Sequence, residues 1–207
     1  MRMTIARHAE TVFNAAARMQ GHMAHTPLTR NGIAQAEAMG AALAAHFGQR
    51  PDIDIWASPS GRTLQTAAIV TEQLGVGFFE VRTDARLLEI DVGDWEGRLY
   101  SEIVAEIGPI TSTERRIFSV QAPNGEWFPA IAARLESWLA DLAPDREVLV
   151  ISHGITLRVL RGLLAGGAPY EGVPLADDAP QGTIFVIENG VQSILHTGAG
   201  TIGVRAA

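Results

Sequence analysis

The fold of this chain is decided by a short stretch in its last third, Val148-Leu149-Val150-Ile151-Ser152-His153-Gly154. It begins with four consecutive apolar residues and ends in Ser-His-Gly. A short apolar run of this kind is typical of a strand covered on both faces. A similar run at the start of the chain, Met3-Thr4-Ile5-Ala6, ends at Arg7-His8. Ligands of open α/β sheets collect at the carboxyl ends of strands. We therefore expect the two histidines to face one crevice.

Alternating strands and helices are predicted around these two runs. Apolar residues at helical spacing predict helices in four segments, with Thr29 as the N-cap of the first: Ile33 to Phe47, Arg62 to Leu74, Trp127 to Leu142 and Ile155 to Leu164. Asp54 to Ala57 reads as a further strand. Near the end of the chain, Thr183 to Glu188 and Val191 to His196 flank Asn189-Gly190, a dipeptide that favours a type I′ hairpin.

This order of elements predicts an α/β fold: a three-layer sandwich with a mostly parallel sheet, helices on both faces and an antiparallel C-terminal edge. We expect residues 1–207 to form a single domain, because no linker or repeat divides them. The less regular stretch from Leu87 to Pro123, with a short helix around Ser101 to Ile107, is expected to cover the crevice.

Composition excludes several classes of protein. Of the 207 residues, 47% are hydrophobic and 19% charged, which is typical of a globular domain. The net charge of −7 argues against nucleic-acid or membrane-surface partners, which favour a basic face. The chain has no cysteine, which excludes disulfides and thiolate chemistry and suits the cytoplasm. The first apolar run stops at Arg7, so no signal peptide is expected, and no stretch is long enough to span a bilayer.

Residues able to bind a phosphoryl group follow three of the predicted strands. They lie in Arg7-His8, in Ser58-Pro59-Ser60-Gly61-Arg62 and in Ser152-His153-Gly154. The planar fork of arginine matches phosphoryl oxygens, and histidine can donate a hydrogen bond or attack phosphorus. A small phosphorylated metabolite, bound as its phosphate monoester, is therefore the expected ligand.

Four ordered blocks resemble the histidine phosphatase superfamily, which includes the cofactor-dependent phosphoglycerate mutases and many acid phosphatases. The first block is Arg7-His8-Ala9-Glu10-Thr11 with Asn14, continued by Gln20-Gly21, Thr26-Pro27-Leu28-Thr29 and Gly32. The others are Ser58 to Ala67, then Leu88-Glu89-Ile90 with Gly93-Asp94-Trp95-Glu96-Gly97, and Ser152-His153-Gly154. The resemblance spans most of the chain and implies the same fold.

The resemblance implies that His8 attacks phosphorus and becomes a phosphohistidine, while Arg7, Arg62 and His153 hold the transferring oxygens. Such a transfer needs an in-line nucleophile and fixed positive charge. His8 must be neutral to attack, so we expect one ring nitrogen to contact a neighbouring carbonyl that sets the tautomer. The further binding residues implied are Asn14, Gln20, Gly21 and Gly154.

Glu89 occupies the position of the proton donor to the leaving oxygen, which later draws a proton from water. That role requires a raised pKa, which partial burial could provide. Asp91 and Glu96 are the rival acids. Arg115-Arg116 is either a solvated surface pair or a grip on a second anionic group of the substrate.

The chain departs from the family pattern at four positions, one of which is Ile155, where a glycine is common and which we interpret as packing variation. Ala9 replaces a glycine, so its methyl group is expected to narrow the pocket. Trp127 replaces a serine at the end of Pro123-Asn124-Gly125-Glu126-Trp127, which puts substrate contact by that segment in doubt. Ser60 replaces a leucine, a change we interpret as packing variation.

The predicted function is a cytoplasmic, metal-independent phosphatase that uses no cofactor. His22-Met23-Ala24-His25 carries two histidines but no acidic or thiol ligand, so no metal site is expected there. One alternative is a phosphoglycerate mutase, and another is an inactive relative that binds phosphorylated ligands. The mutases of the family carry an added segment between the third and fourth blocks, whereas Gly97 to Ile151 is short here. The hairpin edge near Asn189 could pair with a second copy, so a homo-oligomer stays open.

Overall fold

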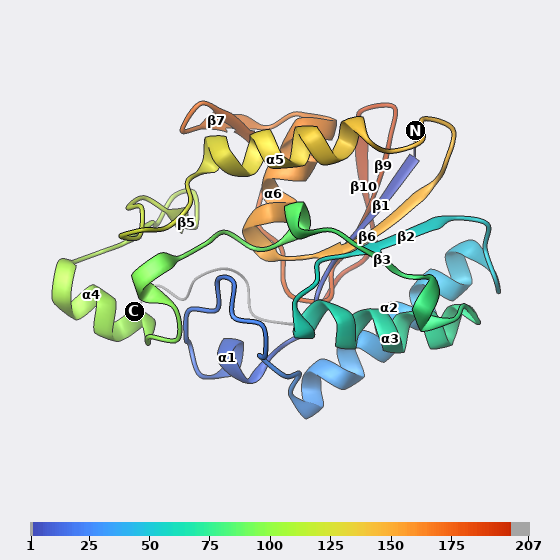
Figure 1. Cartoon of the computed structure of the whole chain (residues 1–207), viewed down its shortest axis with the longest axis horizontal. Helices are drawn as coiled ribbons and strands as arrows, with labels where there is room; N and C mark the ends of the chain where they lie inside the picture. The colour runs from blue at the N-terminus through green and yellow to red at the C-terminus, as the bar shows by residue number, and fades with distance from the viewer. Residues whose placement is uncertain (1, 200–207) are drawn as a thin grey trace.

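The computed structural model describes residues 2–199, and its main sheet has six strands in the order β10-β9-β1-β6-β2-β3 (Figure 1). Their bounds are β1 Arg2–Arg7, β2 Asp54–Ala57, β3 Arg82–Thr83, β6 Val148–Ser152, β9 Ile184–Glu188 and β10 Val191–His196. Strands β1, β6, β2 and β3 are parallel, whereas β9 and β10 form an antiparallel edge. The predicted mostly parallel sheet with an antiparallel C-terminal edge is confirmed.

Helices cover both faces of this sheet, as predicted (Figure 1). Helices α2 (Arg30–Phe47) and α3 (Gly61–Leu74) lie on one face, and α5 (Phe128–Ala140) and α6 (Gly154–Ala165) lie on the other. Because side chains alternate along a strand, Ile5 and Val150 pack toward α5 and α6, while their neighbours Ala6 and Ile151 pack toward α2 and α3. The two cores therefore share the central strands.

The middle of the sheet explains why its sequence is so apolar. All five residues of β6 are buried between its parallel neighbours β1 and β2. The C-terminal edge of the sheet is instead a hairpin of β9 and β10. Asn189 and Gly190 adopt φ angles of 51° and 76°, which the predicted type I′ hairpin requires. The exposed strand β10 follows this turn.

The connections between these strands and helices contain short elements that periodicity does not predict. They are α1 (Val12–Ala15), η1 (Phe78–Glu80), η2 (Ala85–Leu87), η3 (Gly93–Trp95), and two small sheets formed by β4 (Thr111–Ser112) with β5 (Ile117–Phe118) and β7 (Ala168–Tyr170) with β8 (Val173–Leu175). The short helix expected near residue 101 is present as α4 (Tyr100–Ile107), to the left of the sheet in Figure 1.

Two details of the predicted helices are wrong. Ile33 is 45% exposed, whereas Gln35 is buried and accepts a hydrogen bond from the backbone N–H of Glu10. The start of helix α2 is therefore held by the polar side chain of Gln35, whereas the apolar pattern predicts a contact through Ile33. Helix α5 begins after Trp127, its N-cap, and ends before Leu142. Among residues 2–199, no helix is long and apolar enough to cross a membrane.

Candidate active site

The carboxyl ends of three neighbouring parallel strands meet at one edge of the sheet. Arg7 ends β1 and pairs in register with Ser152 at the end of β6, while Ala57 ends β2 beside Ile151. His8, Ser58 and His153 follow directly. Arg7, His8 and Arg62 line one cavity at this edge, and the ring of His153 lies against the ring of His8. The predicted convergence of the strand ends is confirmed.

His8 has the geometry of a neutral nucleophile. Its Nδ1 lies 2.8 Å from the carbonyl oxygen of Ala9, the contact that the sequence predicts, so Nδ1 carries the proton. No described residue is hydrogen-bonded to Nε2, which leaves its lone pair available. Burial lowers the pKa of His8 well below its ordinary value, and the guanidinium groups of Arg62 and then Arg7 lower it further. The imidazole is therefore uncharged at neutral pH.

Arg62 is a buried cation anchored to the loop that carries Gly21. Its Nη2 donates to the carbonyl of Gly21 at 2.9 Å, and its Nη1 donates to Met23 O at 3.1 Å and to Thr26 Oγ1 at 3.2 Å. Burial lowers its pKa to about 10. Arg62 thus stays positively charged at neutral pH and fixes the rim of the cavity.

His153 is held at both ring nitrogens. Nδ1 accepts a hydrogen bond from Arg62 Nε at 3.1 Å, so the proton lies on Nε2, which donates to Ser58 Oγ at 2.7 Å. Ser60 Oγ lies 3.2 Å from the same Nε2. The interpretation of Ser60 as packing variation is therefore wrong, because its hydroxyl is a polar partner of His153. Burial, followed by the charge of Arg62, lowers the pKa of His153 well below its ordinary value.

Arg7 lies flat against the start of α6. A Cβ atom at Gly154 would lie only 3.0 Å from Nη2 and 3.1 Å from Cζ of Arg7, so glycine leaves room for the guanidinium. Nη1 donates to the carbonyl of Ala179 and lies 3.6 Å from Asp178 Oδ1. Gly154 therefore shapes the cavity through the absence of a side chain.

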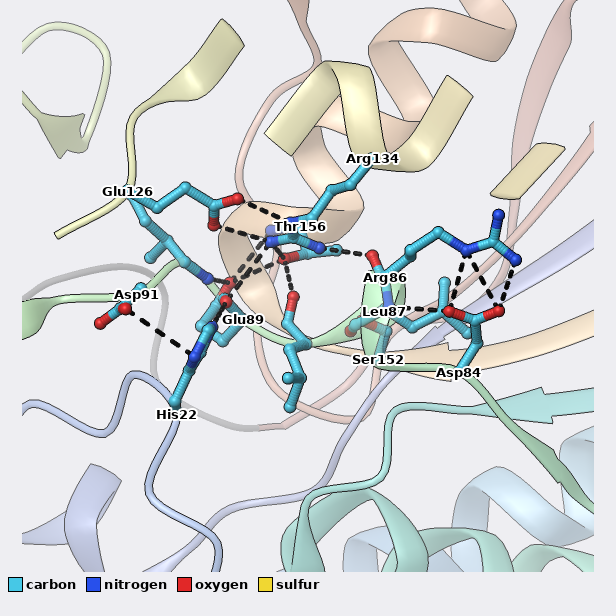
Figure 2. A network of polar contacts seen from close by, with 12 residues as sticks. His22, Asp84, Arg86, Leu87, Glu89, Asp91, Glu126, Arg134, Ser152 and Thr156 are labelled. Atoms are coloured by element: carbon cyan, nitrogen blue, oxygen red, sulfur yellow. Dashed lines mark hydrogen bonds and ion pairs between the residues drawn. The ribbon is translucent and has the colours of Figure 1, made fainter. Parts of the chain in front are cut away.

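Glu89 is one of two carboxylates in the lining of the cavity, the other being Asp178 beside Arg7. It accepts hydrogen bonds from the backbone N–H groups of Ile155 at 3.3 Å and Thr156 at 3.0 Å, in the first turn of α6 (Figure 2). The rivals lie outside the lining. Asp91 Oδ1 accepts from the N–H of Gly93, and Glu96 Oε1 accepts from the N–H of His22. The geometry thus favours Glu89 over both.

Two amides and a glycine complete the lining as the resemblance implied: Asn14, Gln20 and Gly21. The side-chain oxygens of Asn14 and Gln20 both lie 2.9 Å from the hydroxyl of Thr11. Since these oxygens face Thr11, the amino groups are the ends left to contact a ligand. Gly21 has a φ of +48°, and a Cβ there would lie 2.6 Å from Val92.

Further lining residues had no clear signal in the sequence. Tyr100 and Phe118 stack at 6.4 Å and form an aromatic part of the wall, together with Arg158 and Asp178. Burial raises the pKa of Tyr100, with a further contribution from Glu89, so the phenol stays protonated. Tyr100 and Phe118 come from α4 and β5, which supports the expected covering role of this region.

The arginine pair divides between two surfaces. Arg116 lines the cavity, whereas Arg115 points away and donates to the carbonyl of Ala168 at 2.8 Å. Arg158 holds both backbones, because its guanidinium donates to the carbonyls of Arg116 and Arg115 at 2.8 and 2.9 Å. Of the pair, only Arg116 is placed to contact a substrate.

Two of the departures from the family pattern lie outside the lining of the cavity, which was not expected for Ala9 and agrees with the doubt about the segment ending at Trp127. Ala9 is fully buried and does not line the cavity, so the expected narrowing by its methyl group is wrong. The segment ending at Trp127 also stays outside the lining. Its Glu126 instead forms an ion pair with Arg134 at 2.8 Å.

Of the histidines at positions 22 and 25, His22 contacts the segment that carries Glu89. His22 Nε2 lies 2.9 Å from the carbonyl of Glu89, and its Nδ1 lies 3.9 Å from Asp91 Oδ2. Among residues 2–199 no group of three or more histidine, cysteine or acidic side chains could hold a metal ion.

Comparison with known proteins gives a match over nearly the whole chain. The model of the histidine phosphatase superfamily (branch 1) matches residues 3–197. The chain is 32% identical over 175 residues to a glucosyl-3-phosphoglycerate phosphatase of Mycobacterium tuberculosis, covering 79% of this chain and 74% of that protein. It is 30% identical over 174 residues to a probable phosphoglycerate mutase of Yersinia pestis, with 80% and 75% covered.

Solved structures share the fold over almost their full length. A mycobacterial glucosyl-3-phosphoglycerate phosphatase in complex with VO3 aligns with a TM-score of 0.73 at 26% identity, covering 97% of this chain and 99% of that one. An α-ribazole phosphatase from Shigella flexneri aligns with a TM-score of 0.71 at 27% identity, covering all of both chains.

Proposed function

The chain belongs to the histidine phosphatase superfamily, and on this premise we propose that it hydrolyses phosphate monoesters of small metabolites through a phosphohistidine on His8. Neither a metal ion nor a cofactor has a part in the proposed reaction. The similarity to phosphatases that act on a glucosyl-phosphoglycerate and on α-ribazole phosphate supports a small phosphorylated metabolite as substrate.

The observation that carries the proposal is the state of His8. Its Nδ1 is turned to Ala9 O, its Nε2 is free among the described residues, and burial with two nearby cations keeps the ring neutral. A neutral imidazole beside the guanidinium groups of Arg7 and Arg62 has the nucleophile and the positive charge that phosphoryl transfer needs.

The reaction balances in two steps. In the first, His8 Nε2 attacks phosphorus, the ester P–O bond breaks, and protonated Glu89 gives its proton to the leaving oxygen. In the second, water attacks the phosphorus, the Glu89 carboxylate takes a proton from that water, and the P–N bond breaks. Inorganic phosphate leaves, and both residues return to their starting protonation states.

The oxygens of the phosphoryl group would be held by Arg7, Arg62 and the amino groups of Asn14 and Gln20, beside the small Gly21 and Gly154. We assign His153 mainly to fixing Arg62 and His8, because Ser58, Ser60 and Arg62 occupy its ring nitrogens. A direct contact with phosphorus-bound oxygen requires Nε2 to exchange a serine hydroxyl for that oxygen.

Phosphoglycerate mutase activity is the second candidate. Arg116 lines the cavity and could bind a carboxylate beside the phosphate, and one relative is named a probable phosphoglycerate mutase. A mutase must return the phosphoryl group to the substrate before water takes it. The access of water to the phosphohistidine therefore decides between hydrolysis and mutase activity.

Phosphate release from a panel of monoesters tests the proposal, with added chelator and with 3-phosphoglycerate isomerisation followed in parallel. His8→Ala should abolish release and the acid-labile, base-stable labelling of the enzyme, whereas His46→Ala, on α2 and away from the cavity, should keep both. Isomerisation with little release would favour the mutase. Tight binding of phosphate esters with neither reaction would favour an inactive binding protein.

We further propose a cytoplasmic enzyme that consists of one domain and binds neither nucleic acid nor membranes. The cysteine-free composition and the net charge of −7 support this setting. Whether the exposed strand β10 pairs with a second copy is tested by the molar mass in solution.

A further inference from the structure

The segment that carries Glu89 has almost no regular structure of its own. Residues 88–92 form neither helix nor strand, although Glu89 must present its carboxyl group to the cavity. Side chains from other elements fix this backbone instead (Figure 2). Four consecutive carbonyl oxygens, of residues 86, 87, 88 and 89, each accept a hydrogen bond from such a side chain.

The two inner carbonyls are held by hydroxyl groups close to His153. Ser152 Oγ donates to Leu87 O at 2.7 Å, and Thr156 Oγ1 donates to Leu88 O at 2.6 Å. These bonds tie the segment to β6 and to the first turn of α6, the same turn whose N–H groups bind the Glu89 carboxylate.

One guanidinium contacts both outer carbonyls, and at the carbonyl of Glu89 it is joined by His22 Nε2 at 2.9 Å. Arg134 Nη1 donates to Arg86 O, and Arg134 Nη2 lies 3.4 Å from Glu89 O. Arg134 is itself fixed by Glu126, whose two carboxylate oxygens lie 2.8 Å from Nε and 3.0 Å from Nη2. Both side chains are largely buried, with 17% and 14% exposure. Such a bidentate pair has one preferred geometry.

We propose that Glu126 and Arg134 are positioning residues for Glu89, and that this ion pair sets where the proton donor meets the leaving oxygen. The inference rests on the proposed function, in which Glu89 is the acid. It gives a role to the segment of residues 123–127, which does not line the cavity.

The ion pair is suited to this task because α5 anchors it. The helix is packed into the core through Leu135, next to Arg134, and through Trp138, both fully buried. Arg134 thus extends from a packed helix to the backbone on both sides of Leu87 and Leu88. A lysine has one ammonium group and cannot reach two carbonyls and two carboxylate oxygens in the same plane. A displacement of about 1 Å in a catalytic group can cost roughly 100-fold in rate.

The test compares a good leaving group with a poor one in Glu126→Gln and Arg134→Lys. Proton donation matters for phenyl phosphate and hardly at all for 2,4-dinitrophenyl phosphate. We expect kcat/KM for phenyl phosphate to fall about 10- to 100-fold, and kcat/KM for 2,4-dinitrophenyl phosphate to fall less than about threefold. A variant that only loosens the fold would lower both values equally.

Arg146→Lys is the matched control, since Arg146 also bridges two carboxylates, Asp52 at 2.8 Å and Asp54 at 3.3 Å, near the opposite end of β2. It should leave the ratio between the two substrates unchanged. Equal losses, or no loss, in both Glu126→Gln and Arg134→Lys would overturn the inference.

Glu89→Gln and His8→Ala, measured beside them, separate the inference from the function on which it rests. If Glu89→Gln selectively slows phenyl phosphate while the ion-pair variants do not, only the positioning role fails. If Glu89→Gln shows no selectivity, the acid role itself fails, and the positioning role with it. Loss of all turnover in His8→Ala reports on the nucleophile independently of both.

Discussion

The imidazole rings of His8 and His153 meet edge to face, with centroids 5.2 Å apart and planes inclined at 66°. Both rings are buried, yet their partners give them different chemistry. His8 has one nitrogen on a backbone carbonyl and the other free among the described residues, whereas both nitrogens of His153 have side-chain partners. Hydrogen bonding rather than burial therefore separates the proposed nucleophile from the residue that supports it.

Buried neutral histidines make stability depend on pH. Burial lowers the pKa of both rings below 6.5, while the unfolded chain takes up these protons near pH 6.5. The unfolded state therefore binds more protons below pH 6.5, and the free energy of unfolding should fall as pH drops, by up to about 1.4 kcal/mol per pH unit for each histidine.

Urea denaturation between about pH 7.5 and 5.5 measures this slope. His8→Asn should reduce it by the contribution of one histidine, while His46→Asn on α2 serves as the control for removing a histidine away from the cavity. A slope that is the same in wild type and in His8→Asn would contradict the prediction.

The serine hydroxyls around His153 should differ in importance. Ser58 Oγ lies 2.7 Å from Nε2 and Ser60 Oγ lies 3.2 Å away. Losing a buried hydrogen bond costs about 1 kcal/mol, and leaving a buried donor unpaired costs about 1–3 kcal/mol. We expect Ser58→Ala to lower stability more than Ser60→Ala, and the double variant to lower it more than the sum, because each serine can replace the other.

Thermal or urea unfolding of the two single variants and the double variant checks this as a double-mutant cycle. Strict additivity would show that the hydroxyls do not share the Nε2 proton. Full activity and stability in the double variant would restore the interpretation of Ser60 as packing variation.

The sequence predicted five of the six strands of the main sheet, its helices and the convergence of His8, Arg62 and His153, because these depend on periodicity and on the geometry of parallel strands. Even the tautomer of His8 followed from the chemistry that nucleophilic attack requires. These features are local, or are repeated over many residues, and the sequence carries them directly.

What the sequence could not supply depends on contacts between distant segments. Asp178 lies outside the four blocks, and the loop after β8 brings it into the cavity wall, where it meets Arg158 of α6. The polar role of Ser60 depends on His153, 93 positions away. Elements of two or three residues, such as β4 and β7, are too short to produce a periodic signal.

A side chain at Gly154 should displace the guanidinium of Arg7. A Cβ atom there would lie 3.0 to 3.3 Å from three atoms of the Arg7 guanidinium, which must then shift. We expect Gly154→Ala to weaken competitive inhibition by inorganic phosphate about 10-fold, similar to the loss of one charged hydrogen bond in Arg7→Lys. If the double variant loses no more than either single variant, the two changes act through the same guanidinium. Unchanged inhibition in Gly154→Ala would show that Arg7 does not hold the phosphate.

Adjacent arginines offer a matched pair for testing substrate contact. Arg116 lines the cavity, whereas Arg115 donates to Ala168 O and lies over the ring of Tyr170 at 5.9 Å. Arg116→Ala should therefore raise KM for 3-phosphoglycerate about 10-fold through the lost attraction for its carboxylate, and leave KM for phenyl phosphate within about twofold. Arg115→Ala should change neither value, although it should lower the melting temperature. Equal effects of the two variants on KM would mean that neither side chain distinguishes the substrates, and the carboxylate-binding argument for mutase activity would then fail.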